Sequence, residues 1–152
     1  MSNYVISCCS TADLTKEHFE KRNISYICFH YELNGQQYAD DLGQSMPFDQ
    51  FYKAMQDGAT TKTSQINADE FTEYFEGFLK EGKDILHVCL SSGITGVVNS
   101  ANIAREELSE KYPDRKICCA KFDRADRVQV SKEEIPCPRI NSLRFGAVQR
   151  NF

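Results

Sequence analysis

The chain has no run of lysine or arginine, no apolar segment of membrane-spanning length and no C-x-x-C pair. A net charge of −4 without a basic face argues against a nucleic-acid partner, and the short apolar runs argue against a membrane span. The N-terminus has no charged start followed by an apolar stretch, so we expect no signal peptide and a cytoplasmic protein. No histidine stands at a metal-ligand spacing from a cysteine, so we expect no metal and no cofactor.

Cysteine, in contrast, is abundant, with seven residues in the chain. Free cysteine behaves as a small buried hydrophobe, and thiols stay reduced in the cytosol. We therefore interpret most of them as reduced core residues, with a reactive thiol or an unrecognised metal site as the alternatives. Six of the seven fall in strand-like apolar runs, namely Cys8, Cys9, Cys28, Cys89, Cys118 and Cys119.

The length of 152 residues suits one domain with a sizeable core. The apolar run at 85–90 is interrupted only by His87, which we interpret as a packed, hydrogen-bonded core residue, and such runs are typical of parallel sheets covered by helices. The predicted fold is α/β, a three-layer sandwich with a mainly parallel sheet and a small hairpin excursion at Asn34-Gly35. Periodicity predicts strands over 4–8, 25–32, 85–90 and 116–120, helices over 16–22, 48–55, 68–81 and 97–112, and irregular chain over 58–65.

The most informative motif is Ser91-Ser92-Gly93-Ile94-Thr95-Gly96, between a predicted strand and a predicted helix. Such a turn directs free backbone N–H groups and the positive end of a helix dipole at one point, where an anionic group can bind. Ligands of parallel sheets bind beyond the carboxyl ends of the strands. Ser10 and Thr11 follow the first strand and the polar loop 62–65 precedes a helix, so both are candidate contributors. Simple helix capping is the alternative role for these hydroxyls.

Beyond residue 120 the character of the sequence changes. Residues 1–120 carry 11 basic and 18 acidic residues, whereas residues 121–152 carry 7 and 4. The second segment shows little periodicity apart from a candidate edge strand at 128–130. We therefore expect a domain over 1–120 and a divergent basic tail over 121–152, which is either disordered or a docking arm.

Four stretches, in order, resemble the DegV family of bacterial fatty-acid-binding proteins. They are Ser10-Thr11-Ala12-Asp13-Leu14, Phe51-Tyr52-Lys53-Ala54-Met55 with Gly58, Thr63-Ser64-Gln65 with Phe71, and the Ser91 to Gly96 motif with Ser100-Ala101. Nothing after about Cys119 matches the family pattern.

The resemblance implies a carrier, not an enzyme, that binds a long-chain fatty acid such as palmitate or oleate by its carboxylate. It implies that Thr63 and Ser92 hold the carboxylate, and the candidate site includes their neighbours Ser64, Ser91 and Gly93 together with Ser10. It also implies a fatty acid kinase subunit as a partner, to which the bound acid is presented for phosphorylation.

Three alternatives to a fatty-acid carrier are considered. A serine hydrolase lacks support because the motif is not G-x-S-x-G and no histidine follows Ser92. A phosphate or nucleotide binder would use the same turn, but neither G-x-x-x-x-G-K-[ST] nor G-x-G-x-x-G is present. The third is a truncated or frameshifted fragment without function. If the family's second domain is absent, the exposed apolar surface would favour a homo-oligomer.

Overall fold

The computed structural model describes residues 3–123 and 127–129. Its main sheet has the strand order β2-β1-β6-β7-β8. Every neighbouring pair in it is parallel except β7 with β8, which is antiparallel. The strands are β1 (Tyr4–Cys9), β2 (Ile24–Ile27), β6 (Asp84–Cys89), β7 (Ile117–Asp123) and β8 (Arg127–Gln129).

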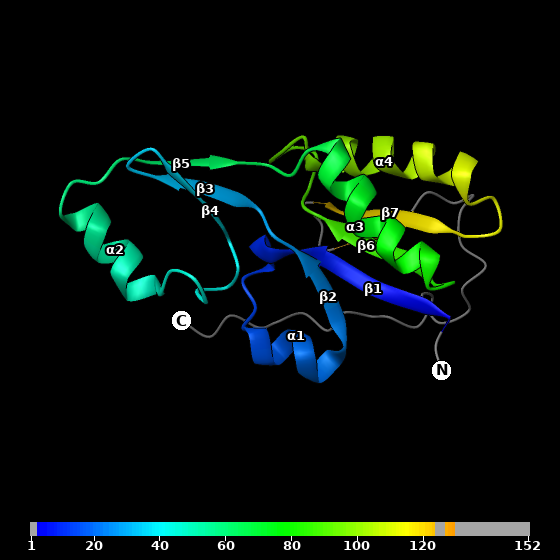
Figure 1. Ribbon diagram of the computed structural model, residues 1–152, viewed down its shortest axis with the longest axis horizontal. Helices are drawn as coiled ribbons and strands as arrows, with labels where there is room; N and C mark the ends of the chain where they lie inside the picture. Colours follow the sequence, from blue (N-terminus) through cyan, green and yellow to red (C-terminus); the bar gives the residue numbers. More distant parts are fainter. Residues whose placement is uncertain (1–2, 124–126, 130–152) are drawn as a thin grey trace.

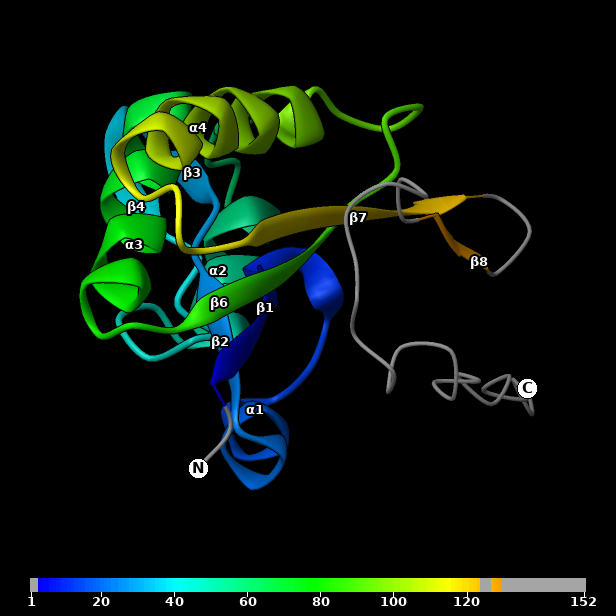
Figure 2. The ribbon, with the colours of Figure 1, turned by 90° about the vertical axis from the view of Figure 1, so that its right-hand side faces the viewer.

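Helices flank this sheet on both sides (Figure 2). Helices α3 (Ala68–Lys80) and α4 (Val97–Lys111) pack against each other and cover β6 and β7. Helix α1 (Lys16–Arg22) lies on the other side, beside β2. The predicted α/β class with a mainly parallel sheet is therefore confirmed.

Side-chain caps stabilise the starts of α1 and α3, and a glycine follows the end of α3. Asn67 and Glu70 form a capping box at the start of α3, because each side chain accepts a hydrogen bond from the other residue's backbone N–H. Thr15 caps α1 by accepting from the N–H of His18 at 3.3 Å. Gly82 follows α3 with a φ of 74°, a left-handed conformation that glycine adopts without strain.

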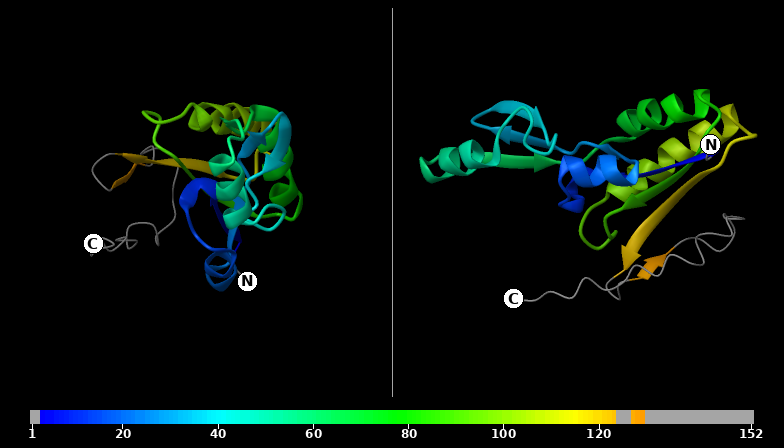
Figure 3. Two further views of the ribbon diagram at one scale, coloured as in Figure 1. Left: turned by 90° about the vertical axis from the view of Figure 1, so that its left-hand side faces the viewer. Right: turned by 90° about the horizontal axis from the view of Figure 1, so that it is seen from below.

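A second, smaller sheet with the order β4-β3-β5 projects from one end of the main sheet (Figures 1 and 3). It consists of β3 (His30–Leu33), β4 (Gln36–Ala39) and β5 (Thr61–Ser64), and α2 (Phe48–Gln56) packs against it. Asn34 and Gly35 form the predicted hairpin turn, both with positive φ.

Two sequence-based predictions fail in this region. The single strand predicted over 25–32 is divided at Cys28 and Phe29 between the two sheets, because the N–H of Phe29 donates to Ser10 Oγ at 3.0 Å instead of joining a strand ladder. The segment 58–65, predicted to be irregular, contains β5. This strand is stabilised by backbone pairing with β3, which its polar sequence does not indicate.

The core lies between the main sheet and the helices α3 and α4. Phe71 and Phe75 of α3 and Val97 of α4 have no exposed surface, and they pack with Ile85 and Cys89 of β6. This packing fixes where β6 ends and where the following turn begins.

A chain of polar groups crosses the core at His87. The Nδ1 atom of its ring lies 3.0 Å from Ser7 Oγ, which in turn lies 2.8 Å from the hydroxyl of Tyr74. The ring packs edge-on against Phe71 and Phe75, with centroid distances of 5.2 Å to each. Burial lowers the pKa of His87 to about 3, because the charged form is desolvated. His87 is therefore a neutral, hydrogen-bonded core residue, as predicted.

The described cysteines are buried or half-buried. Burial raises the pKa of Cys8 to about 11 and that of Cys9 to about 12, so neither thiol ionises at neutral pH. No group of three metal-binding side chains occurs among the residues that the structure describes. These thiols thus have the environment expected of core residues.

The predicted boundary at residue 120 falls inside a strand. β7 continues to Asp123, and β8 forms the predicted edge strand one residue earlier than expected. The disorder or docking role predicted for the tail concerns mostly 124–126 and 130–152, which lie outside the described residues. Within the described part of the chain, no helix is long and apolar enough to cross a membrane.

The neutral state of His87 predicts an acid-sensitive fold. Its folded pKa of about 3 lies below the ordinary value of 6.5, so the unfolded chain binds the extra proton between these values. The contribution of His87 to stability is therefore complete above pH 6.5 and is lost as the pH falls towards 3, at about 1.4 kcal/mol per pH unit well below pH 6.5. Urea unfolding between pH 7.5 and 4.5 measures this slope.

His87→Gln should flatten that pH dependence, since it keeps a hydrogen-bonding group but does not titrate. His18→Gln on α1 is the matched control and should keep the wild-type slope. Equal slopes for wild type and His87→Gln would contradict a buried neutral imidazole.

Candidate ligand-binding site

A cavity of about 650 Å³ lies where the carboxyl end of the main sheet meets the small sheet and α2. This is the edge at which open α/β sheets bind ligands. Much of its wall is apolar or aromatic, and a smaller number of hydroxyl, amide, imidazole and carboxylate groups complete it. The apolar wall includes Phe29, Met46, Phe48, Phe51, Leu90 and Ile94.

The structure brings only part of the predicted site to this cavity. Thr63 and Ser64 line it, as do Leu90, Ile94 and Thr95 on either side of the serine-glycine turn. Ser91 to Gly93 themselves are not among its lining residues. Ser92 and Gly93 are exposed, and Ser91 is half-buried. Ser10 is buried and accepts the hydrogen bond from Phe29.

Strand register separates the two hydroxyls of β5. Thr63 pairs with Tyr31 and Ser64 pairs with His30 across the antiparallel ladder, and directly paired residues share a face of the sheet. Tyr31 packs edge-on against Phe51 of α2, with a centroid distance of 5.2 Å. Thr63 therefore lies on the aromatic face towards α2, whereas Ser64 shares the opposite face with His30.

The serine-glycine turn uses several of its own N–H groups. Ile94 and Thr95 donate to the carbonyl of Ser91 at 2.9 and 3.3 Å, and Gly93 donates to its Oγ at 3.3 Å. The expectation of free N–H groups is therefore wrong for these three. Thr95, not a serine, accepts from the N–H of Val97 at the start of α4.

Gln65 joins this turn to β5. Its Oε1 accepts a hydrogen bond of 2.9 Å from the hydroxyl of Thr95, and a Cβ at Gly96 would stand 3.4 Å from the same oxygen. The glycine thus leaves room for the glutamine side chain. Gln65 and Thr95 both belong to the motifs found in the sequence. The hydrogen bond between them is not predictable from the sequence, because the two positions are 30 residues apart.

Lys121 is a second residue that the sequence did not indicate. It lies on β7, where it pairs with Cys89 of the neighbouring strand β6, and its Nζ lies 3.5 Å from Ser92 Oγ. A cation therefore stands beside a predicted carboxylate-binding serine. The boundary predicted at residue 120 places this lysine in the basic tail, because no local pattern indicates that β7 extends past Ala120.

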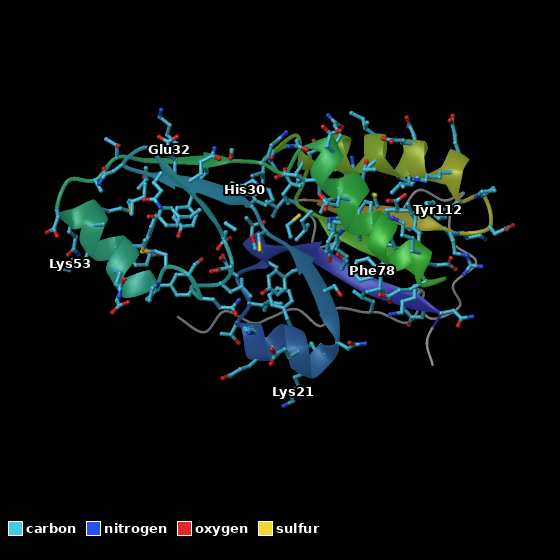
Figure 4. The ribbon with its side chains drawn as sticks, viewed as in Figure 1. Lys21, His30, Glu32, Lys53, Phe78 and Tyr112 are labelled. Atoms are coloured by element: carbon cyan, nitrogen blue, oxygen red, sulfur yellow. The ribbon has the colours of Figure 1, made fainter. Side chains whose placement is uncertain are left out.

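His30 forms a close pair with Glu70, with 2.6 Å between Nε2 and Oε1. Figure 4 shows His30 on the side of the small sheet that faces α3. Glu70 also accepts from the N–H of Asn67 at 2.8 Å. One carboxylate thus connects the start of α3 with the small sheet beside the cavity.

The described residues place no serine-histidine pair at the serine-glycine turn. The two ring nitrogens of His87 lie next to Ser7 and Cys9, and Nε2 of His30 is paired with Glu70. Ser92 has a lysine beside it instead of an imidazole. Among the described residues, no histidine contacts Ser92 to activate its hydroxyl as a nucleophile.

Comparison with known proteins identifies relatives over most of the chain. The family model described as "Uncharacterised protein, DegV family COG1307" matches residues 6–123. A DegV domain-containing protein of Clostridium perfringens is 38% identical over 117 residues, which are 77% of this chain and 40% of the relative. A DegV domain-containing protein of Lactococcus lactis is 31% identical over 71% of this chain and 37% of its own length. The chain thus spans about two fifths of the length of these relatives.

Solved structures of DegV proteins and fatty-acid-binding proteins are also similar to this chain. A stearic acid-binding protein of Eubacterium ventriosum superposes with a TM-score of 0.68 at 28% identity, over 76% of this chain and 40% of its own. A protein of Thermotoga maritima, described as revealing a fatty acid binding function, gives a TM-score of 0.61 at 29% identity, over 70% and 40%. With the family model matching more than half of its residues and the parallel sheet in place, this chain belongs to the DegV family.

Proposed function

We propose that this chain binds a long-chain fatty acid, with the acyl tail in the cavity and the carboxylate at its hydroxyl-bearing edge. The observation that carries the proposal is the make-up of the cavity wall, which combines aromatic side chains of the small sheet and α2 with the hydroxyl of Thr63. Apolar walls with few, convergent polar groups are typical of sites for ligands of this kind. Two similar structures are described as proteins that bind stearic acid or fatty acids.

The tail supplies most of the affinity in this arrangement. Each buried methylene contributes about 0.8 kcal/mol, and a hydrogen bond to a charged group contributes about 1.5–3 kcal/mol. A tail of palmitate or oleate length therefore outweighs the head-group bonds before the entropy of binding is subtracted. The hydroxyls then serve mainly to orient the acid.

The head-group role rests on Thr63 and Ser92, as the family resemblance implies. Thr63 faces the aromatic side of the cavity, and Ser92 has the Lys121 ammonium nearby to attract an anion. Ser64, Ser91 and Gly93 lie next to these two positions. The hydroxyl oxygen of Ser10 already accepts from Phe29, so we assign Ser10 the role of positioning Phe29.

The proposal includes a cytoplasmic carrier that is not itself an enzyme and presents the acid to a fatty acid kinase subunit. Hydroxyl donors suit this role, because they hold a carboxylate without the fixed bidentate grip of an arginine.

An open rim predicts weak binding by this chain alone. Phe48, Tyr52 and Ile94 line the cavity, yet they are 58%, 60% and 76% exposed. A bound tail would therefore remain partly in contact with water, and the exposed apolar rim would favour association with another chain. Native mass spectrometry after bacterial expression should show partial occupancy by a fatty acid. Full occupancy by palmitate or oleate on a monomer would contradict weak binding.

Thr63→Val tests the head-group role. It keeps the side-chain shape and removes the hydroxyl, so we expect at least a tenfold loss of palmitate affinity in a fluorescence displacement titration. Thr61→Val, two residues earlier on β5 and outside the cavity lining, is the matched control and should bind as wild type does. Equal losses in both variants would point to a disturbed strand and would argue against a carboxylate contact.

A chain-length series tests the role of the tail. Laurate has four methylenes fewer than palmitate, so a fully buried tail would lose about 3 kcal/mol, at about 0.8 kcal/mol per methylene. The exposed rim should reduce this difference, and we expect laurate to bind roughly ten- to a hundredfold more weakly. Equal affinities for the two acids would show that the cavity does not receive the tail.

A further inference from the structure

Thr11 is a cavity residue with an unusual hydroxyl. It lies in the short 3-10 helix Ser10–Ala12 that follows β1, and it lines the cavity. Its Oγ1 is buried and has no hydrogen-bond partner among the residues that the structure describes. Most buried polar side-chain atoms in folded proteins are hydrogen-bonded, so an orphan of this kind calls for a physical reason.

The backbone around Thr11 is held firmly. Ser10 Oγ accepts from the N–H of Phe29 at 3.0 Å, which ties the turn to the crossover between the two sheets. Asp13 closes the 3-10 helix in the left-handed conformation, with a φ of 55°. Thr11 is therefore placed by its neighbours, and its own hydroxyl makes no hydrogen bond within the described part of the chain.

Thr11 lies at the carboxyl edge of the main sheet, beside other hydroxyls of the cavity wall. β1 and β6 are parallel neighbours, so Thr11 beyond the end of β1 and Leu90 beyond the end of β6 reach the same edge of the sheet, and both line the cavity. Thr63 and Thr95 line the same cavity. Three hydroxyls thus arrive from three separate segments of the chain.

We propose that Thr11 is a further carboxylate-binding residue, whose hydroxyl donates to the head group of the bound fatty acid. This inference rests on the proposed function. Because Oγ1 has no partner among the described residues, rotation about χ1 towards the ligand breaks none of their hydrogen bonds and gives the hydroxyl an acceptor. A neutral fatty ester attracts this donor less than a carboxylate does, since hydrogen bonds to charged acceptors are the stronger ones.

Thr11→Val provides the test, with Thr11→Ser as its conservative partner. Valine keeps the shape and removes an unpaired hydroxyl, so the ligand-free thermal midpoint should stay equal to that of wild type or rise. Palmitate affinity should fall about tenfold, whereas the affinity for methyl palmitate, with the same tail and no charge, should change less than threefold. Thr11→Ser should retain most of the palmitate affinity.

The outcomes separate this inference from the proposed function. If Thr11→Val binds palmitate as wild type does while Thr63→Val binds it poorly, Thr11 is not a ligand residue and the carrier function stands. If wild type binds no palmitate, both proposals fail. If Thr11→Val lowers the thermal midpoint and weakens palmitate and methyl palmitate equally, the hydroxyl is structural and the inference is overturned.

Discussion

The hydrogen bond between Ser7 and His87 is the constraint on which the rest of the molecule depends. The two residues are paired neighbours on β1 and β6, and the bond is extended to α3 by Tyr74. A shift of the register by one residue would leave a buried imidazole without its partner and turn apolar side chains to the wrong face. The network therefore fixes which ends of β1 and β6 lie together.

That fixed edge is where the small sheet is attached. The N–H of Phe29 donates a hydrogen bond to Ser10, which follows β1. The hydroxyl of Thr95, which follows β6, donates a hydrogen bond to Gln65. The segments that enter and leave the small sheet are thus each anchored to the end of a main-sheet strand. The cavity lies between these two anchors, so the core of the main sheet determines where the aromatic wall stands relative to the hydroxyls.

Short sequence patterns predict those features of the fold that depend on residues close together in the chain. The turn at Asn34-Gly35 and the buried strand at His87 are encoded in short patterns, and both predictions are confirmed. The division of residues 25–32 and the strand β5 depend on partners distant in sequence, and no short pattern carries that information. The same holds for the candidate site: the four motifs indicate loops that could contribute to it, but the opposite faces of Thr63 and Ser64 follow only from the pairing of β5 with β3.

The hydroxyls at this edge of the sheet differ in whether they already make hydrogen bonds within the protein. Those of Ser10, Ser91 and Thr95 accept backbone hydrogen bonds, and Thr95 also donates to Gln65. A ligand that recruited these groups would have to compete with the folded chain, which weakens its net gain. Recognition of an anion is less costly through a group that the fold does not use. The hydroxyl of Thr11, which has no partner among the described residues, meets this condition, because a ligand that accepts a hydrogen bond from it recovers free energy lost on its burial.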